Sequence, residues 1–169
     1  SAPDDTAGAP AIRAVGAVNL CQNSPEFQDN SAGAGSTSDG GAIFANTIVL
    51  CASRAPNVSS NNRARRGGAF YGVASIMLNQ HNVGANTAQF GGCAFSDGTV
   101  TFDGVDASGC RATNDGGAAM AITVLLQGNG TSLFTNNSAG GAGGVARATS
   151  FSASRTVSFF ATISWPAVI

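Results

Sequence analysis

Six short blocks along the chain alternate small or polar residues with large apolar ones. In each block the second and fourth positions are large and apolar, whereas the first and third positions vary. Alternation with a period of two residues predicts a β-strand with one buried face. The blocks are Ala17–Leu20, Thr47–Leu50, Ser75–Leu78, Thr99–Phe102, Thr123–Leu126 and Thr156–Phe159.

A pair of glycines followed by a small residue precedes five of these blocks. The pairs begin at Gly40, Gly67, Gly91, Gly116 and Gly143, in steps of 27, 24, 25 and 27 residues. Glycine suits corners that need a positive φ or a close backbone approach, and the residues after each pair are typical of a second strand. One short strand per repeat cannot bury its apolar face, but strands stacked from successive repeats can. The sequence therefore predicts an all-β solenoid of about six coils with 24–33 residues per coil.

Asparagine recurs in a fixed phase upstream of most glycine pairs. Asn30, Asn62, Asn86 and Asn137 each stand two residues before an alanine, and Cys110 occupies the same slot. Stacked asparagine side chains can hydrogen-bond to one another and so satisfy polar groups at an inward turn. Asparagine also simply favours turns, but the fixed phase favours a ladder.

Two Phe-x-x-Asn motifs, Phe27–Asn30 and Phe134–Asn137, accompany the Gly-Gly-Ala motifs. The combination resembles the polymorphic outer-membrane-protein repeat family of chlamydial surface autotransporters, over roughly residues 17 to 160. The resemblance implies a right-handed parallel β-helix that is secreted or displayed at the cell surface. In the chlamydial members it also implies adhesion to host cells.

Composition narrows the possible functions. Charged residues make up 10% of the 169 residues, the formal net charge is −1, and all eight basic residues are arginines. The chain therefore lacks the polybasic surface of a nucleic-acid binder. No apolar run approaches the roughly 20 residues of a membrane-spanning helix.

The four cysteines predict two disulfides. Cys21 and Cys51 both directly follow an apolar block, one coil apart. Equivalent positions in stacked strands lie about 4.8 Å apart, within the Cα separation of a disulfide. In a cytosolic protein the same pair would remain a reduced stack. Cys93 and Cys110 fall in different columns, and their pairing follows by elimination. No Cys-x-x-Cys motif with histidine partners occurs, so we expect no metal site.

The cysteines and three Asn-x-Ser/Thr sequons favour an extracellular or cell-surface location. The sequons make Asn57, Asn129 and Asn136 candidate glycosylation sites. In a chain rich in asparagine and serine, such triplets also arise by chance.

The carboxylates are too scattered to predict an enzyme. Parallel β-helix enzymes that cleave polysaccharides need clustered carboxylates, usually with a basic residue or calcium. The candidates are Asp97, Asp103, Asp106 and Asp115, with Arg111 nearby in sequence. The only histidine, His81, stands between polar residues and is expected in a solvated turn. We therefore expect no catalytic residue and no cofactor, with a carbohydrate-binding or polysaccharide-cleaving protein as the alternative.

Two surface features could serve binding. The segment after the second block carries arginines that either contact an acidic glycan or partner or form a solvated rim: Arg54, Arg63, Arg65 and Arg66. The first column of the blocks is rich in threonine, as on ice-binding solenoids, but the second column is irregular and threonine favours strands in general. Ice binding is the less favoured alternative.

The chain is expected to contain three regions. Residues 1–14 form an N-terminal extension or cap, residues 15–160 the parallel β-helix, and residues 161–169 an apolar cap or interface. Open strand edges at the ends of a β-helix must be capped or paired. The sequence predicts a non-catalytic structural or adhesive module. Its expected partners are further copies of the same chain, other surface proteins or glycans. We expect no nucleic-acid partner and no transmembrane segment.

Overall fold

The computed structural model describes residues 10–21, 25–32, 39–51, 57–128, 130–154 and 158–160. These ranges form 17 β-strands and no helix, so they contain no helix able to span a membrane. All strand pairs are parallel. The all-β class predicted from the alternating blocks is confirmed.

The strands form three sheets, which we name A, B and C. Sheet A contains β1 (Ile12–Arg13), β2 (Ala17–Leu20), β4 (Ile43–Cys51), β6 (Phe70–Asn79), β9 (Ala94–Ser96), β10 (Thr99–Asp103), β13 (Ala119–Leu126) and β16 (Ala146–Ala153). Sheet B contains β3 (Phe27–Gln28), β5 (Asn57–Ser60), β7 (His81–Gly84), β11 (Asp106–Ser108), β14 (Leu133–Thr135) and β17 (Ser158–Phe160). Sheet C contains β8 (Thr87–Phe90), β12 (Arg111–Asp115) and β15 (Ser138–Ala139).

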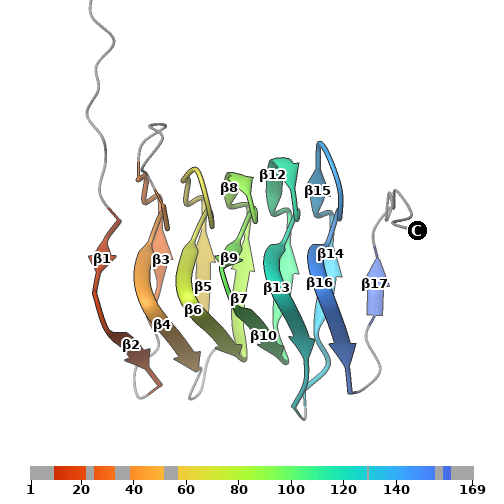
Figure 1. Ribbon diagram of the computed structural model, residues 1–169, viewed down its shortest axis with the longest axis horizontal. Coiled ribbons are helices and arrows are strands. Elements are labelled where there is room, and N and C mark those ends of the chain that lie inside the picture. Colours follow the sequence, from red (N-terminus) through yellow and green to blue (C-terminus); the bar gives the residue numbers. More distant parts are fainter. Residues whose placement is uncertain are drawn as a thin grey trace, which may run out of the picture.

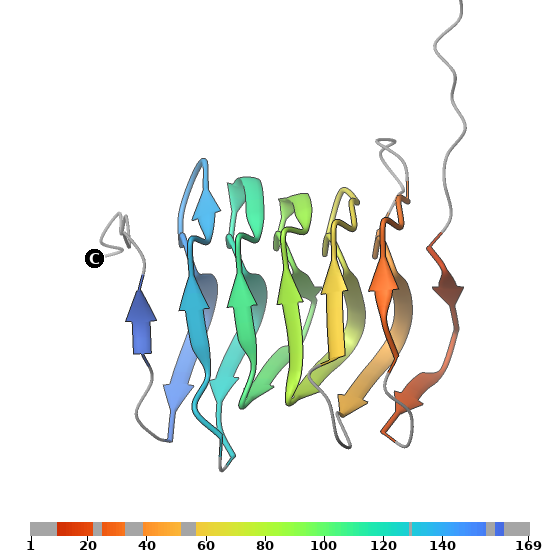
Figure 2. The same cartoon turned by 180° about the vertical axis from the view of Figure 1, so that it is seen from behind.

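The chain winds through the sheets as a β-solenoid of about five turns. In Figure 1 the sheet A strands run downward in front, the sheet B strands run upward behind, and the chain advances from left to right, which is a right-handed winding. Figure 2 shows sheet B from its own side. The sequence predicts about six coils, and the structure has about five turns. The difference arises because sheet A has six successive strand positions, and one full turn lies between each position and the next.

Five of the six predicted blocks lie in register in sheet A. Their inward columns run Val18, Ile48, Ile76, Val100, Val124 and Leu20, Leu50, Leu78, Phe102, Leu126. In three coils each block is continuous with the apolar residues after the glycine pair, in the long strands β4, β6 and β13. The predicted second strand is therefore the first half of one bent strand, divided only between β9 and β10.

The predicted position of the sixth block in sheet A is wrong. Ser150–Ala153, not Thr156–Phe159, continues the columns, since Phe151 pairs with Val124 and Ala153 with Leu126. Ser158–Phe160 instead form β17 and pair with β14 in sheet B. The physical reason is spacing: earlier blocks begin seven or eight residues after their glycine pair, and the same interval after Gly143 ends at Ser150.

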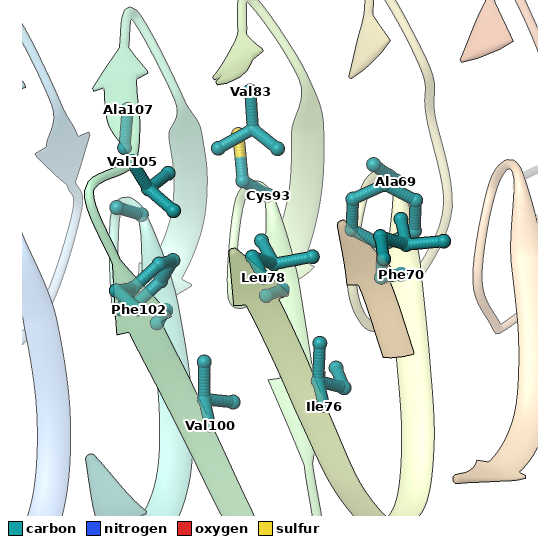
Figure 3. Close-up of a cluster of buried hydrophobic side chains, with 14 of the residues drawn as sticks. Ala69, Phe70, Ile76, Leu78, Val83, Cys93, Val100, Phe102, Val105 and Ala107 are labelled. Carbon is teal, nitrogen blue, oxygen red and sulfur yellow. The ribbon is translucent and has the colours of Figure 1, made fainter. Parts of the chain in front are cut away.

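The core fills the space between the sheets. Its largest fully buried side chains include Phe70, Phe102, Phe134, Ile76 and Leu78. Figure 3 shows Ile76 and Leu78 of one coil beside Val100 and Phe102 of the next, with Val83, Val105 and Ala107 facing them. Each layer of apolar side chains thus packs on the layer before it, which is how a solenoid builds a core that no single repeat has.

The two glycines of each pair have different structural roles. Gly91 has a φ of 61°, in the region that favours glycine. At Gly92, an added Cβ would lie 2.2 Å from the carbonyl oxygen of Gly117 in the next coil. The first glycine makes the corner, and the second allows successive coils to stack closely.

The described part of sheet A ends at β1 on one side and at β16 on the other. Sheet A begins with Ile12 and Arg13, which pair with β4 and fall within the predicted extension 1–14. At the other end Phe151 is 49% exposed although its column faces the core, because no described strand stacks on β16. The predicted cap or interface, residues 161–169, lies outside the described residues.

Candidate functional site

Two disulfides cross-link the solenoid, one between adjacent coils and one within a coil. The Cys21–Cys51 disulfide joins two stacked positions with a Cα–Cα distance of 4.3 Å. The Cys93–Cys110 disulfide crosses the interior of one coil with a Cα–Cα distance of 5.4 Å, and both residues are fully buried. Both predicted pairings are confirmed, and the described residues contain no free cysteine.

The predicted asparagine ladder is also present. Asn30 donates a hydrogen bond to Asn62 Oδ1, and Asn62 donates one to Asn86 Oδ1, each at 2.9 Å. Cys110 interrupts the side-chain ladder, but its backbone N–H donates to Asn137 Oδ1. Asn62, Asn86 and Asn137 are almost fully buried. The ladder therefore has the structural role of satisfying buried polar groups.

A cluster of charged and aromatic side chains lies outside the core, at the corner between sheets C and A. We name it the corner cluster: Asp39, Arg65, Arg66, Tyr71 and Asp97. Arg66 binds Asp39 with a shortest N–O distance of 2.5 Å, and Arg65 reaches the same carboxylate at 3.2 Å. The Tyr71 hydroxyl donates a hydrogen bond to Asp97. The hydrogen bond to Asp39 raises the pKa of Arg66 above its usual value.

Arg66 lies over an outward-facing aromatic stack. Its guanidinium carbon is 4.5 Å from the Tyr71 ring centroid and 5.3 Å from that of Phe95. Such cation–π contacts fix the orientation of an arginine. Burial, and then the hydrogen bond to Asp97, raises the pKa of Tyr71 to about 12. Tyr71 therefore keeps its proton at neutral pH and holds the Asp97 carboxylate in place.

A groove begins at this cluster and crosses the last coils of sheet A. We name it the sheet A groove; its volume is ≈ 930 Å³. Apolar side chains line much of it, with polar groups at its edges; the lining includes Phe95, Asp97, Met120, Ile122, Ala148 and Arg147. Arg147 forms an ion pair with Asp115. An apolar floor with a few charged groups is typical of a ligand site.

The structure separates the four candidate carboxylates into two pairs. Asp97 lies in the sheet A groove, and Asp115 reaches it through its ion pair with Arg147. Asp103 and Asp106 lie at the far end of β10 and the start of β11. No cluster of three or more possible metal ligands occurs within the described residues.

The predicted arginine cluster is divided between two surfaces. Arg66 and Arg65 belong to the corner cluster through their ion pairs with Asp39. Arg65 also lines, together with Arg63, a small pocket on the outer face of sheet C. Arg54 lies outside the described residues. Their binding role stays a prediction.

The expectation for His81 is wrong. His81 begins β7, is fully buried, and its Nε2 atom lies 2.8 Å from Ser59 Oγ. Its Nδ1 atom has no hydrogen-bond partner. Burial lowers the pKa of His81 to about 4, so the ring is neutral near pH 7. Inward alternation with Val83 in β7 places His81 in the core, although its neighbours in sequence are polar.

The remaining predicted surface sites have mixed placements. Asn136 is exposed in a turn with a φ of 54°, Asn57 begins β5, and Asn129 lies outside the described residues. The threonine-rich column is in register and runs Ala17, Thr47, Ser75, Thr99, Thr123 and Ser150. Glycosylation and ice binding stay predictions.

Sequence reasoning missed Asp39, Tyr71 and Arg147. A signal for two of them was present: the fourth residue after the first glycine of each pair forms one outward column, Phe44, Tyr71, Phe95, Met120 and Arg147. The column is recognisable once the repeats are aligned on their glycine pairs. Asp39 could not be found in this way, because its role depends on contacts made across the corner.

No protein-family model, curated protein or solved structure matches this chain. The β-solenoid architecture therefore rests on the structure, and the resemblance to polymorphic outer-membrane-protein repeats rests on the sequence motifs alone.

Proposed function

We propose that this chain is a non-catalytic adhesive module of the cell surface or extracellular space, and that the sheet A groove binds carbohydrate. The observation that carries the proposal is the composition of the groove. Met120, Ile122 and Phe95 offer an apolar surface, and Asp97 and Arg147 stand at its edges.

A sugar ring presents apolar C–H faces and polar hydroxyl edges. An apolar platform can pack against the faces, and charged side chains form stronger hydrogen bonds with hydroxyls than neutral ones do. Asp97 is held by Tyr71, and Arg147 by Asp115. Because these groups are held before binding, little side-chain entropy would be lost when a ligand is bound.

Two further observations support the location and the class of protein. Disulfides persist mainly in oxidising compartments, and this chain has two. The motif resemblance to chlamydial surface repeats favours adhesion rather than catalysis.

A pair of matched substitutions tests the groove. Ile122→Asp puts a charge on a groove residue that is 58% exposed, whereas Val73→Asp changes a 40% exposed residue of β6 outside the groove. We expect a panel of neutral polysaccharides to contain at least one that binds the intact protein. Ile122→Asp should weaken that binding about tenfold or more, equivalent to at least about 1.4 kcal/mol, and Val73→Asp should not.

The measurement is isothermal titration calorimetry, with circular dichroism to confirm that both variants fold. Equal weakening by both substitutions, or no binding of any neutral polysaccharide by the intact protein, would refute the groove as an adhesive carbohydrate site. Catalytic turnover of a bound polysaccharide, lost in Asp97→Asn, would instead support the enzyme alternative.

A further inference from the structure

The outer face of sheet C carries a second surface feature, separate from the sheet A groove. Arg63 and Arg65 are two residues apart on one extended segment, with the buried Ala64 between them. Side chains at such positions point to the same face. Arg63 pairs in register with Thr87, and Thr87 pairs with Arg111 of the next coil. We name Arg63, Arg65 and Arg111 the arginine face.

A pocket of ≈ 150 Å³ lies within this face. Arg63, Arg65, Thr87, Gln89 and Thr113 line it, and none of its described lining residues is acidic. The pocket is smaller than the roughly 300–1,000 Å³ of sites that enclose a whole small ligand. It is therefore suited to one charged substituent of a larger molecule.

The charges of the arginine face are only partly neutralised. Arg65 is paired with Asp39 at the corner. Arg63 and Arg111 are exposed, and within the described residues the structure records no side-chain ion pair for either of them. Three of the eight basic residues thus gather on one face of a chain whose net charge is −1. Guanidinium groups bind carboxylate and sulfate with paired hydrogen bonds.

We propose that the arginine face binds an acidic polysaccharide, with one sulfate or carboxylate group in the pocket between Arg63 and Arg65. Arg111 stands two strands away from Arg63, at about 10 Å along the solenoid axis. A ligand that engages both must carry anionic groups at intervals along its length. This periodic arrangement favours a polymer over a single free anion, and it goes beyond the neutral carbohydrate proposed for the groove.

The test compares four probes with the intact, disulfide-bonded protein: sulfated dextran, polygalacturonate, unsubstituted dextran and sodium sulfate. Binding is measured by biolayer interferometry at low and moderate salt. We expect the sulfated or the carboxylated polymer to bind, more weakly at the higher salt concentration, and unsubstituted dextran not to bind through this face.

Single charge removals locate the site. Arg63→Gln and Arg111→Gln should each weaken binding of the anionic polymer about 5- to 10-fold. Arg13→Gln is the matched control, because Arg13 is exposed and lies over Phe44 on sheet A, away from sheet C. The control should change affinity by no more than about twofold.

Four outcomes would overturn the proposal. The first two are that neither anionic polymer binds, or that Arg13→Gln weakens polymer binding as much as Arg63→Gln does. The other two are that unsubstituted dextran binds as tightly as the anionic polymers and loses this binding in Arg63→Gln, or that free sulfate binds as tightly as the polymer. Failure here leaves the groove intact, since the groove is tested with neutral polysaccharides and with Ile122→Asp. Binding of neutral polysaccharides that survives Arg63→Gln would show that the two sites are separate.

Discussion

A buried histidine makes the folding stability of this protein depend on pH. His81 lies in the core against Phe70, with ring centroids 5.8 Å apart, and its pKa of about 4 in the folded protein is below the 6.5 of an exposed ring. Between these values the unfolded chain binds a proton that the folded protein does not, so folding stability falls as the pH falls from 6.5 towards 4. Above pH 6.5 both states are neutral at this residue and the effect vanishes.

We expect protonation of His81 in the unfolded chain to lower the free energy of unfolding by about 2.5 kcal/mol at pH 4.5 relative to pH 7. Urea unfolding of the intact protein and of His81→Gln at pH 7, 5.5 and 4.5 measures it, and carboxylate effects common to both proteins cancel in the difference. An identical decline in the two proteins would contradict this account. If His81→Gln does not fold, the chemical shift of the His81 ring protons in the intact protein serves instead. Between pH 7 and pH 5 it should change by no more than about a tenth of its full titration shift.

Neither the position of His81 nor the corner cluster follows from local sequence. The tetrapeptide around His81 is polar throughout, and only the phase of β7 relative to Val83 decides that the ring faces inward. The corner cluster depends on contacts between different coils. Arg66 lies over the rings of Tyr71 in β6 and Phe95 in β9, and it also binds Asp39. Contacts of this kind need the folded geometry of the corner.

Among the elements, the stacking of one coil on the next leaves no room for a side chain at Gly92, the second glycine of its pair. At Gly92 a Cβ would meet the Gly117 carbonyl oxygen at 2.2 Å and the Arg111 backbone at 2.6 Å, and neither atom can move without shifting a whole coil. Gly92→Ala should therefore destabilise the protein by about 3 kcal/mol.

Gly16→Ala is the control, because an added Cβ there has no neighbour within 4 Å. It should be neutral or stabilising by up to about 1 kcal/mol. Thermal and urea unfolding of both variants measure the difference. A Gly92→Ala protein as stable as the Gly16→Ala protein would show that the coils stack less tightly than the structure indicates.

Repetition explains why most elements could be predicted from sequence. Five apolar blocks, five glycine pairs and four ladder asparagines share one phase, and each of these signals supports the others. The sixth block failed because the final coil has two alternating segments, Ser150–Ala153 and Thr156–Phe159, and alternation alone does not distinguish sheet A from sheet B. Spacing from the glycine pair does.

At the scale of the whole molecule, stability should vary along the solenoid axis. Strands β6 and β10 have neighbours on both sides, whereas within the described residues β16 pairs only with β13. Parallel strands direct alternate backbone groups to opposite neighbours, so half of the β16 amides face away from β13. Local opening is easiest where such bonds are missing.

Hydrogen exchange followed by mass spectrometry or NMR tests this gradient. Amides of β6 and β10 should exchange slowest, and the outward amides of β16 at least about tenfold faster. Protection of β16 equal to that of β10 would mean that another strand covers this edge. Dependence of that protection on protein concentration would identify the strand as part of a second copy, and independence would assign it to the same chain.

The placement of the disulfides also determines how the protein would respond to tension. A solenoid pulled from its ends can lengthen one winding at a time, and a winding of 24–27 residues releases at most roughly 80–100 Å of chain. The Cys93–Cys110 disulfide spans 17 residues within one winding, so it withholds roughly 60 Å of that length. If the chain is displayed at the cell surface, as proposed above, and carries load there, the redox state of its surroundings sets how far it extends before it ruptures. The extension is shorter where the disulfides persist and longer where they are reduced.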